Sequence, residues 1–112
     1  MLKIILSVLL SLTLLLGGLA QPAWAGDAAN GAKIFSGKCA SCHLGGNNVV
    51  NPQKTLKKDV LESFGMLSEA AIVTQVTNGK AAMPKFLGQL TDSEIEDVAD
   101  YVLAQAEKGW QS

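Results

Sequence analysis

The sequence has no arginine, a single histidine and only two cysteines among its 112 residues. Its nine lysines form no basic cluster of the kind that binds nucleic acid, so no nucleic-acid partner is expected. No segment alternates polar and apolar residues over a useful length, and no glycine-rich phosphate-binding loop is present. These absences argue against a β-rich fold and a nucleotide site, and they leave an all-helical chain.

The first 25 residues follow the three-part pattern of a secretory signal peptide. Lys3 gives a positive start, an apolar run follows over Ile4–Leu16, and residues 23–25 (Ala-Trp-Ala) form a small-x-small cleavage site. A membrane anchor is the alternative, but Ile4–Ala20 is just shorter than the roughly 18 apolar residues of a spanning helix, and no basic cluster follows it. We therefore expect residues 1–25 to be cleaved and to leave no stable membrane anchor.

Cleavage after Ala25 would leave one domain, residues 26–112, with eight lysines and ten acidic residues and so a formal charge of −2. A domain of this size buries a modest fraction of its surface and usually needs a disulfide, a metal or another internal staple. The two cysteines and the lone histidine are the candidates for that staple.

Both cysteines and the histidine lie in one pentapeptide, Cys39-Ala40-Ser41-Cys42-His43. This Cys-x-x-Cys-His spacing is the attachment pattern of c-type haem. Two thiols three positions apart on a helical turn can each bond to one haem vinyl group, and the next residue then brings an imidazole to the iron. The pattern predicts one covalently bound haem c, with Cys39 and Cys42 as anchors and His43 as an axial ligand.

Two other uses of these cysteines find less support. A disulfide of the thioredoxin type lies beside a β-α-β unit, and no such unit is visible in the sequence. A zinc site needs about four ligands, and the chain has no second pair of cysteines or histidines to complete one.

The sixth iron ligand must come from elsewhere, because a single histidine excludes bis-histidine ligation. Methionine, lysine, water or an open position remain, and His/Met ligation is the arrangement of electron-transfer haems. Met66 precedes a helix start and is expected to pack in the core. Met83 lies in a loop without helical periodicity, and Pro84 fixes the backbone after it. Met83 is therefore the predicted distal ligand.

Helical spacing and capping residues predict four helices. Their expected ranges are 28–40, after the Asp27 cap; 57–64, ending at Gly65; 68–78, between Ser68 and Gly79; and a last helix from the Thr91–Glu94 capping box to Gly109. Residues 44–55 are expected to form an ordered loop at one haem edge. Gly31 predicts a close contact with the last helix, since an interior glycine costs about 1 kcal/mol relative to alanine. The acidic residues of the last helix are expected on its outer face: Asp92, Glu94, Glu96, Asp97 and Asp100.

From Gly26 to Trp110 the sequence resembles the class I c-type cytochromes, and within them the photosynthetic cytochrome c6 branch. The resemblance lies in the haem motif and in the more specific blocks Asn30-Gly31-Ala32-Lys33-Ile34-Phe35, Gly45-Gly46-Asn47-Asn48-Val49-Val50, Lys54-Thr55-Leu56, Gln75-Val76-Thr77-Asn78-Gly79-Lys80-Ala81-Ala82-Met83-Pro84 and Gly109-Trp110. It implies the all-α class I cytochrome c fold, with about four helices around one haem c.

The resemblance also implies roles for individual residues. It places Cys39, Cys42, His43 and Met83 on the haem, in agreement with their spacing, and Gln75 close to it. The carbonyl of Pro52, or another carbonyl of that loop, would accept the free ring N–H of His43. One block departs from the family, because Gly88-Gln89-Leu90 has glutamine where many relatives carry an arginine that could anchor a photosystem partner.

As a function, the resemblance implies a soluble one-electron carrier and not an enzyme, and a monomer is the default state for such a shuttle. It would dock briefly with the cytochrome b6f complex and with photosystem I in the thylakoid lumen of a cyanobacterium or plastid, with a terminal oxidase as a further acceptor. A respiratory c-type cytochrome serving an oxidase in a bacterial periplasm is the alternative carrier, since it would share every haem residue. A haem enzyme or gas sensor would instead need a vacant or labile sixth position.

Overall fold

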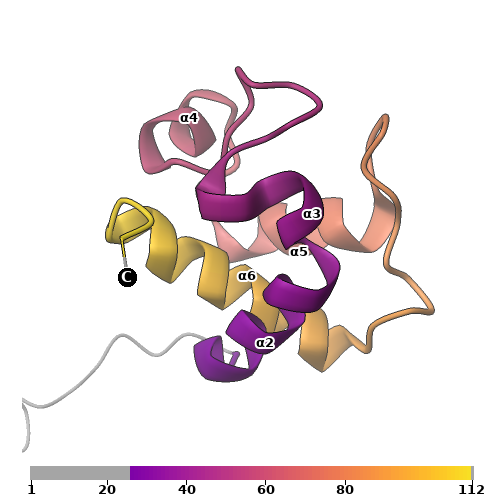
Figure 1. The fold of residues 1–112 in the computed structure, drawn as a ribbon. Coiled ribbons are helices and arrows are strands. Elements are labelled where there is room, and N and C mark those ends of the chain that lie inside the picture. The colour runs from indigo at the N-terminus through magenta and orange to yellow at the C-terminus, as the bar shows by residue number, and fades with distance from the viewer. Residues whose placement is uncertain (1–25, 112) are drawn as a thin grey trace, which may run out of the picture.

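Helices are the regular secondary structure of residues 26–111, the part of the chain that the computed structural model describes. They are α2 (Ala28–Lys38), α3 (Ala40–His43), the 3-10 turn η1 (Leu44–Gly46), α4 (Lys58–Ser63), α5 (Glu69–Asn78) and α6 (Asp92–Glu107), as Figure 1 shows. The predicted all-α fold is confirmed. The predicted signal peptide, residues 1–25, lies outside the described residues. Within the described range, no helix has the length and apolar character needed to cross a membrane.

Helix α2 packs across α6, and this is the most extensive contact between helices in the described range (Figure 1). A Cβ atom at Gly31 would lie 2.6 Å from the carbonyl carbon of Asp97 and 2.8 Å from Tyr101 Cβ, so only glycine permits the contact. The predicted close approach of these two helices is confirmed. Phe35 of α2 extends the contact, because its ring centroid lies 5.1 Å from that of Tyr101 and 5.4 Å from that of Trp110.

The predicted caps are present. The Ser68 hydroxyl accepts a hydrogen bond from the Ala71 amide at the start of α5, and Thr91 and Glu94 form the reciprocal capping box of α6. The predicted boundaries of the helices beginning near residues 57 and 91 differ slightly, since α4 spans Lys58–Ser63 and α6 ends at Glu107. The first helix also ends two residues before the predicted position, at Lys38, with Cys39 as its C-cap (φ −118°, ψ −31°).

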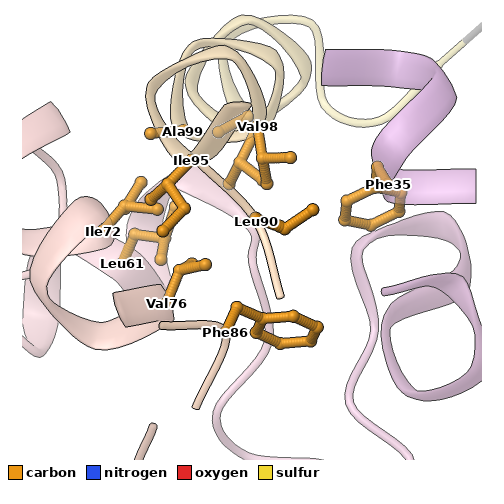
Figure 2. Close-up of a cluster of buried hydrophobic side chains, with 11 residues drawn as sticks. Phe35, Leu61, Ile72, Val76, Phe86, Leu90, Ile95, Val98 and Ala99 are labelled. Carbon is orange, nitrogen blue, oxygen red and sulfur yellow. The ribbon is translucent and has the colours of Figure 1, made fainter. Parts of the chain in front are cut away.

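The hydrophobic core lies between α5, α6 and the segment that joins them. Figure 2 shows Phe35 entering this cluster from α2, opposite Ile72 and Val76 of α5. Phe86 and Leu90 of the connecting segment are also buried, and the Phe86 amide donates to the Val76 carbonyl at 2.9 Å. The segment that carries Met83 is therefore fastened to the C-terminal end of α5.

The prediction that all five acidic residues of α6 face outward is wrong for two of them. Asp97 is 7% exposed and Asp100 is completely buried. The reason is the segment before α2, which lies against this side of α6 and supplies hydrogen-bond donors. The Gly26 amide donates to Asp100 Oδ2, and the Asp27 amide donates to Asp97 Oδ1 at 2.7 Å.

Candidate functional site

The haem-attachment motif occupies a turn of its own, α3, directly after α2. The Cys39 amide donates to the Phe35 carbonyl at 2.9 Å, which closes α2, and the Cys39 carbonyl accepts from the amides of Cys42 at 3.1 Å and His43 at 2.9 Å. Cys39 is thus shared by the two helices, and one turn brings Cys39, Cys42 and His43 together. Both cysteines are partly buried and form no disulfide with each other. Before haem attachment, burial raises the pKa of the Cys39 thiol from 9.0 to about 11.

The imidazole of His43 is oriented by a backbone carbonyl. Its Nδ1 lies 2.9 Å from the Asn47 carbonyl oxygen. Since a carbonyl only accepts, Nδ1 carries the proton and Nε2 keeps a free lone pair for a metal. The loop around Pro52 was expected to supply this acceptor, and it does, but through Asn47. Asn47 follows His43 by four residues, and the turn η1 folds it back toward the imidazole. In this turn the Asn47 amide donates to the Leu44 carbonyl at 3.2 Å.

Residues 44–55 form the ordered loop that the turn residues predict. The Val49 amide donates to the Cys42 carbonyl at 3.0 Å, which ties the loop to α3. The Asn48 side chain stabilises the second half of the loop. Its Oδ1 accepts hydrogen bonds from the amides of Val50 and Asn51, and its Nδ2 donates to the Lys54 carbonyl. Leu44, Val49 and Val50 are 71%, 66% and 64% exposed, so an apolar surface adjoins the haem-attachment motif.

Met83 lies in the segment between α5 and α6, in a tight turn. Its amide donates to the Lys80 carbonyl at 2.9 Å, and its carbonyl accepts from the Lys80 amide at 3.0 Å. Gly79 makes the turn possible: its φ is +69°, and a Cβ there would lie 2.7 Å from both the Met83 carbonyl oxygen and the Lys85 amide nitrogen. Gln75 reaches the Met83 side chain from α5, with its Nε2 3.6 Å from the sulfur.

A cavity of about 520 Å³ lies along one side of α5 and the start of the Met83 turn. It is a shallow hollow, wide open to solvent. Gln75 and Met66 both line it, and Met66 also packs against the core, as predicted. The complete lining is Met66, Ala70, Ala71, Thr74, Gln75, Asn78, Gly79 and Lys80.

The donor groups of this region suit a c-type haem. Two cysteine side chains and an imidazole whose Nε2 can bind a metal come from one turn, and a thioether comes from the loop after α5. Cys39 and Met83 both pack against the hydrophobic core cluster. Within residues 26–111, no group of three or more His, Cys, Asp and Glu side chains is placed to hold a metal ion.

Sequence reasoning missed two contributors to this region. The Asn47 carbonyl is a backbone group, and a sequence carries little information about which carbonyl of a loop will meet a ring nitrogen. The role of Gly79 in shaping the Met83 turn was also missed, because the residue was interpreted only as the stop of the preceding helix. Its positive φ serves both purposes.

Comparison with known proteins gives consistent results. The family described as "Cytochrome C oxidase, cbb3-type, subunit III" matches residues 26–102. Cytochrome c6 of Thermosynechococcus vestitus is 64% identical over 96 residues, which cover 86% of each chain. Cytochrome c6 of Nostoc sp. is 56% identical over 109 residues, which cover 97% of this chain and 98% of the relative.

The fold agrees with these relatives. The solved structure of cytochrome c6 from the diatom Phaeodactylum tricornutum matches with a TM-score of 0.74 at 53% identity, covering 76% of this chain and all of that one. Cytochromes c6 are electron-transfer proteins and not enzymes. The chain therefore belongs to the class I c-type cytochromes, in their cytochrome c6 family, and is an electron carrier with one covalently bound haem c that has His/Met axial ligation.

Proposed function

We propose that this chain is a soluble carrier that takes single electrons from the cytochrome b6f complex and delivers them to photosystem I in the thylakoid lumen. The observation that carries the proposal is the joint presence of the Cys39–His43 turn and the Met83 turn in a chain 56–67% identical to curated cytochromes c6. The signal-peptide pattern of residues 1–25 supports export to that compartment, with cleavage after Ala25.

Four side chains hold the haem in this proposal. Cys39 and Cys42 form the two thioether bonds, His43 is the proximal ligand through Nε2, and Met83 is the distal ligand through its sulfur. The hydrogen bond from His43 Nδ1 to the Asn47 carbonyl supports the first axial assignment, because it fixes the ring and its tautomer. The position of Gln75 Nε2 beside the Met83 sulfur supports the second, because it restricts where that side chain can lie.

The ligand set accounts for carrier behaviour. The bound haem iron supplies reversible one-electron oxidation and reduction, and His/Met ligation raises its reduction potential. With both axial positions filled by side chains of this chain, none is open to a substrate. The short turns that hold His43 and Met83 limit rearrangement of the ligands when the charge changes.

Brief docking suits a carrier, and the surface beside the haem motif is suited to it. Leu44, Val49 and Val50 offer a small apolar surface at the loop that adjoins α3. Small interfaces of this kind are typical of transient redox complexes. The formal charge of −2 on residues 26–112 gives weak electrostatic steering and permits rapid release.

A terminal oxidase is the second candidate acceptor. The description of the family that matches residues 26–102 names a subunit of a cytochrome c oxidase. Electron transfer to an oxidase would depend on the same haem-binding residues of this chain. The two candidates share the carrier chemistry and differ only in the acceptor.

Electron delivery to each acceptor tests the proposal. Reduced holo-protein is mixed with photosystem I particles, and the rate at which the flash-oxidised reaction centre is re-reduced is followed as protein concentration rises. A saturating increase supports the assignment. If photosystem I is not re-reduced, while the same sample supports oxygen uptake by a terminal oxidase, the photosynthetic acceptor is wrong and the respiratory one replaces it.

A further inference from the structure

The N-terminal edge of the described chain meets a buried carboxylate on α6. Asp100 has no solvent exposure, and its Oδ2 accepts a hydrogen bond from the backbone nitrogen of Gly26. Its Oδ1 is also buried and has no hydrogen-bond partner in residues 26–111. The neighbouring Asp97 is better satisfied, because its two oxygens accept from the Asp27 amide and from Asn30 Nδ2, each at 2.7 Å.

No positive side chain offsets the charge of Asp100. The ion pair found within residues 26–111 is Lys58–Glu107, both of which are exposed, and the chain contains no arginine. Buried charges in proteins are ordinarily paired with an opposite charge, because removing an isolated carboxylate from water is costly. An amide nitrogen at Gly26 offers one hydrogen and no charge, which leaves this carboxylate only partly satisfied.

The atom that touches Asp100 is the one that signal cleavage would convert. Hydrolysis of the Ala25–Gly26 peptide bond adds the hydroxyl of water to the Ala25 carbonyl carbon and a proton to the Gly26 nitrogen. The resulting α-amine has an ordinary pKa of about 7.7–8.0 and takes up a further proton near pH 7. An ammonium at this position carries one positive charge and three hydrogens, enough to donate to both oxygens of Asp100.

The residue at position 26 has the size that this contact requires. A Cβ atom on Gly26 would lie 2.7 Å from Asp100 Oδ2 and 2.7 Å from the backbone carbon and oxygen of Glu96. Contacts that short with backbone atoms force the chain to shift, so a larger residue would move the nitrogen away from the carboxylate. Glycine directly after the cleavage site thus allows the new terminus to reach a buried partner.

We propose that removal of the signal peptide creates a buried ion pair between the α-ammonium group of Gly26 and the carboxylate of Asp100. Asp100 and the α6 backbone at Glu96 form a binding site for the new N-terminus. Processing then contributes to the stability of the mature fold in addition to releasing the protein. This inference rests on the proposed cleavage after Ala25.

A thermodynamic cycle on the haem-loaded protein tests the ion pair. Four proteins are compared by chemical denaturation: the chain that begins at Gly26, the same chain with Ala25 retained, and Asp100→Asn in each. Retaining Ala25 is expected to raise the unfolding equilibrium constant roughly tenfold when Asp100 is present, and to have little effect when asparagine replaces it. Equal effects of the extension in both backgrounds would overturn the ion pair.

A second measurement does not depend on how well Asp100→Asn folds. The rate at which an amine-selective acylating reagent modifies the Gly26 α-amine at pH 7 is measured against the rate for a short peptide of residues 26–31. Slower modification in the protein by a factor of about ten is expected, because the amine is partly buried and the Asp100 carboxylate holds it in its protonated form. The other acidic groups on the two packed segments, Asp27, Glu96 and Asp97, would also favour the protonated amine and slow its modification. The variant Asp97→Asn measures how much of the slowing comes from Asp97. A rate equal to that of the peptide would overturn the proposal.

The mass of the naturally processed protein separates the two parts of the inference. A mature chain that begins at a residue other than Gly26 defeats the cleavage assignment, and the ion pair with it. A chain that begins at Gly26 but shows no coupling to Asp100 defeats the ion pair alone. The optical spectrum of each protein serves as the control that the haem site is intact.

Discussion

Gln75 Nε2 lies 3.6 Å from the sulfur of Met83, across the gap between α5 and the loop that follows it. An amide that donates toward a thioether draws electron density from the sulfur. If that sulfur binds iron, as we propose, the oxidised metal loses more stabilisation than the reduced metal. The Gln75 side chain is therefore placed to raise the reduction potential.

Replacing Gln75 by leucine should lower the potential. The expected decrease is on the order of tens of millivolts, the effect of losing one weak hydrogen bond beside a metal ligand. A redox titration of the holo-protein gives the value. Gln89→Leu is the matched control, because Gln89 is exposed and its Nε2 contacts only the Lys85 carbonyl, at 3.3 Å. Equal potentials in the two variants would remove Gln75 from any role at the haem.

Met83→Ala should open the sixth coordination position. We expect loss of the near-infrared band that reports sulfur-to-iron ligation, binding of carbon monoxide by the reduced form, and a large decrease in potential. Optical spectroscopy of both redox states measures all of these. Met66→Leu should keep the sulfur band, because Met66 packs against the core and we assign the distal ligand to Met83. Loss of the band in Met66→Leu alone would reverse the assignment of the distal ligand.

Two glycines of α2 give a matched pair for the helix crossing. Gly31→Ala should destabilise the fold by about 3 kcal/mol or more, because the new methyl group collides with the α6 backbone at Asp97. Gly37→Ala places its methyl group where, apart from its chain neighbours and the backbone of its own helix, no atom of residues 26–111 lies within 4 Å, and should stabilise the protein by up to about 1 kcal/mol. Denaturant unfolding of the holo-proteins gives both values. Similar stabilities would show that the α2–α6 contact can relax around a side chain.

The capping box of α6 predicts a smaller, local effect. Thr91→Ala removes the hydroxyl that accepts from the Glu94 amide at 3.1 Å, and should cost about 1 kcal/mol of unfolding free energy. Ser93→Ala, two residues along in the same helical turn, should change stability much less. Thermal unfolding followed by circular dichroism distinguishes the two.

Much of this molecule could be predicted from local patterns. The caps at Ser68 and Thr91 and the contact at Gly31 follow from short-range chemistry, and each is confirmed. The outward placement of Asp97 and Asp100 was wrong for a physical reason. Helical periodicity assigns charged residues to solvent unless something else satisfies them, and here the donors come from residues about 70 positions earlier in the chain.

The region around the haem motif shows the same limit. The pentapeptide and its chemistry are evident from the sequence, but the break in the helix at Cys39 and the choice of the Asn47 carbonyl depend on how the following loop closes. That closure involves a distant partner, because Trp110 Nε1 donates to the Leu56 carbonyl at 2.9 Å. Contacts between residues 54 positions apart leave no periodic trace in a sequence.

The crossing of α2 and α6 also orders events during biosynthesis. The first of these helices leads directly into the cysteines, and the second follows the Met83 turn much later in the chain. The core against which Cys39 packs requires Ile95, Val98 and Val102, so it cannot form around an incomplete chain. We therefore expect the surroundings of Cys39 to form only once α6 has joined the fold, so that both thiols are accessible for haem attachment before that point.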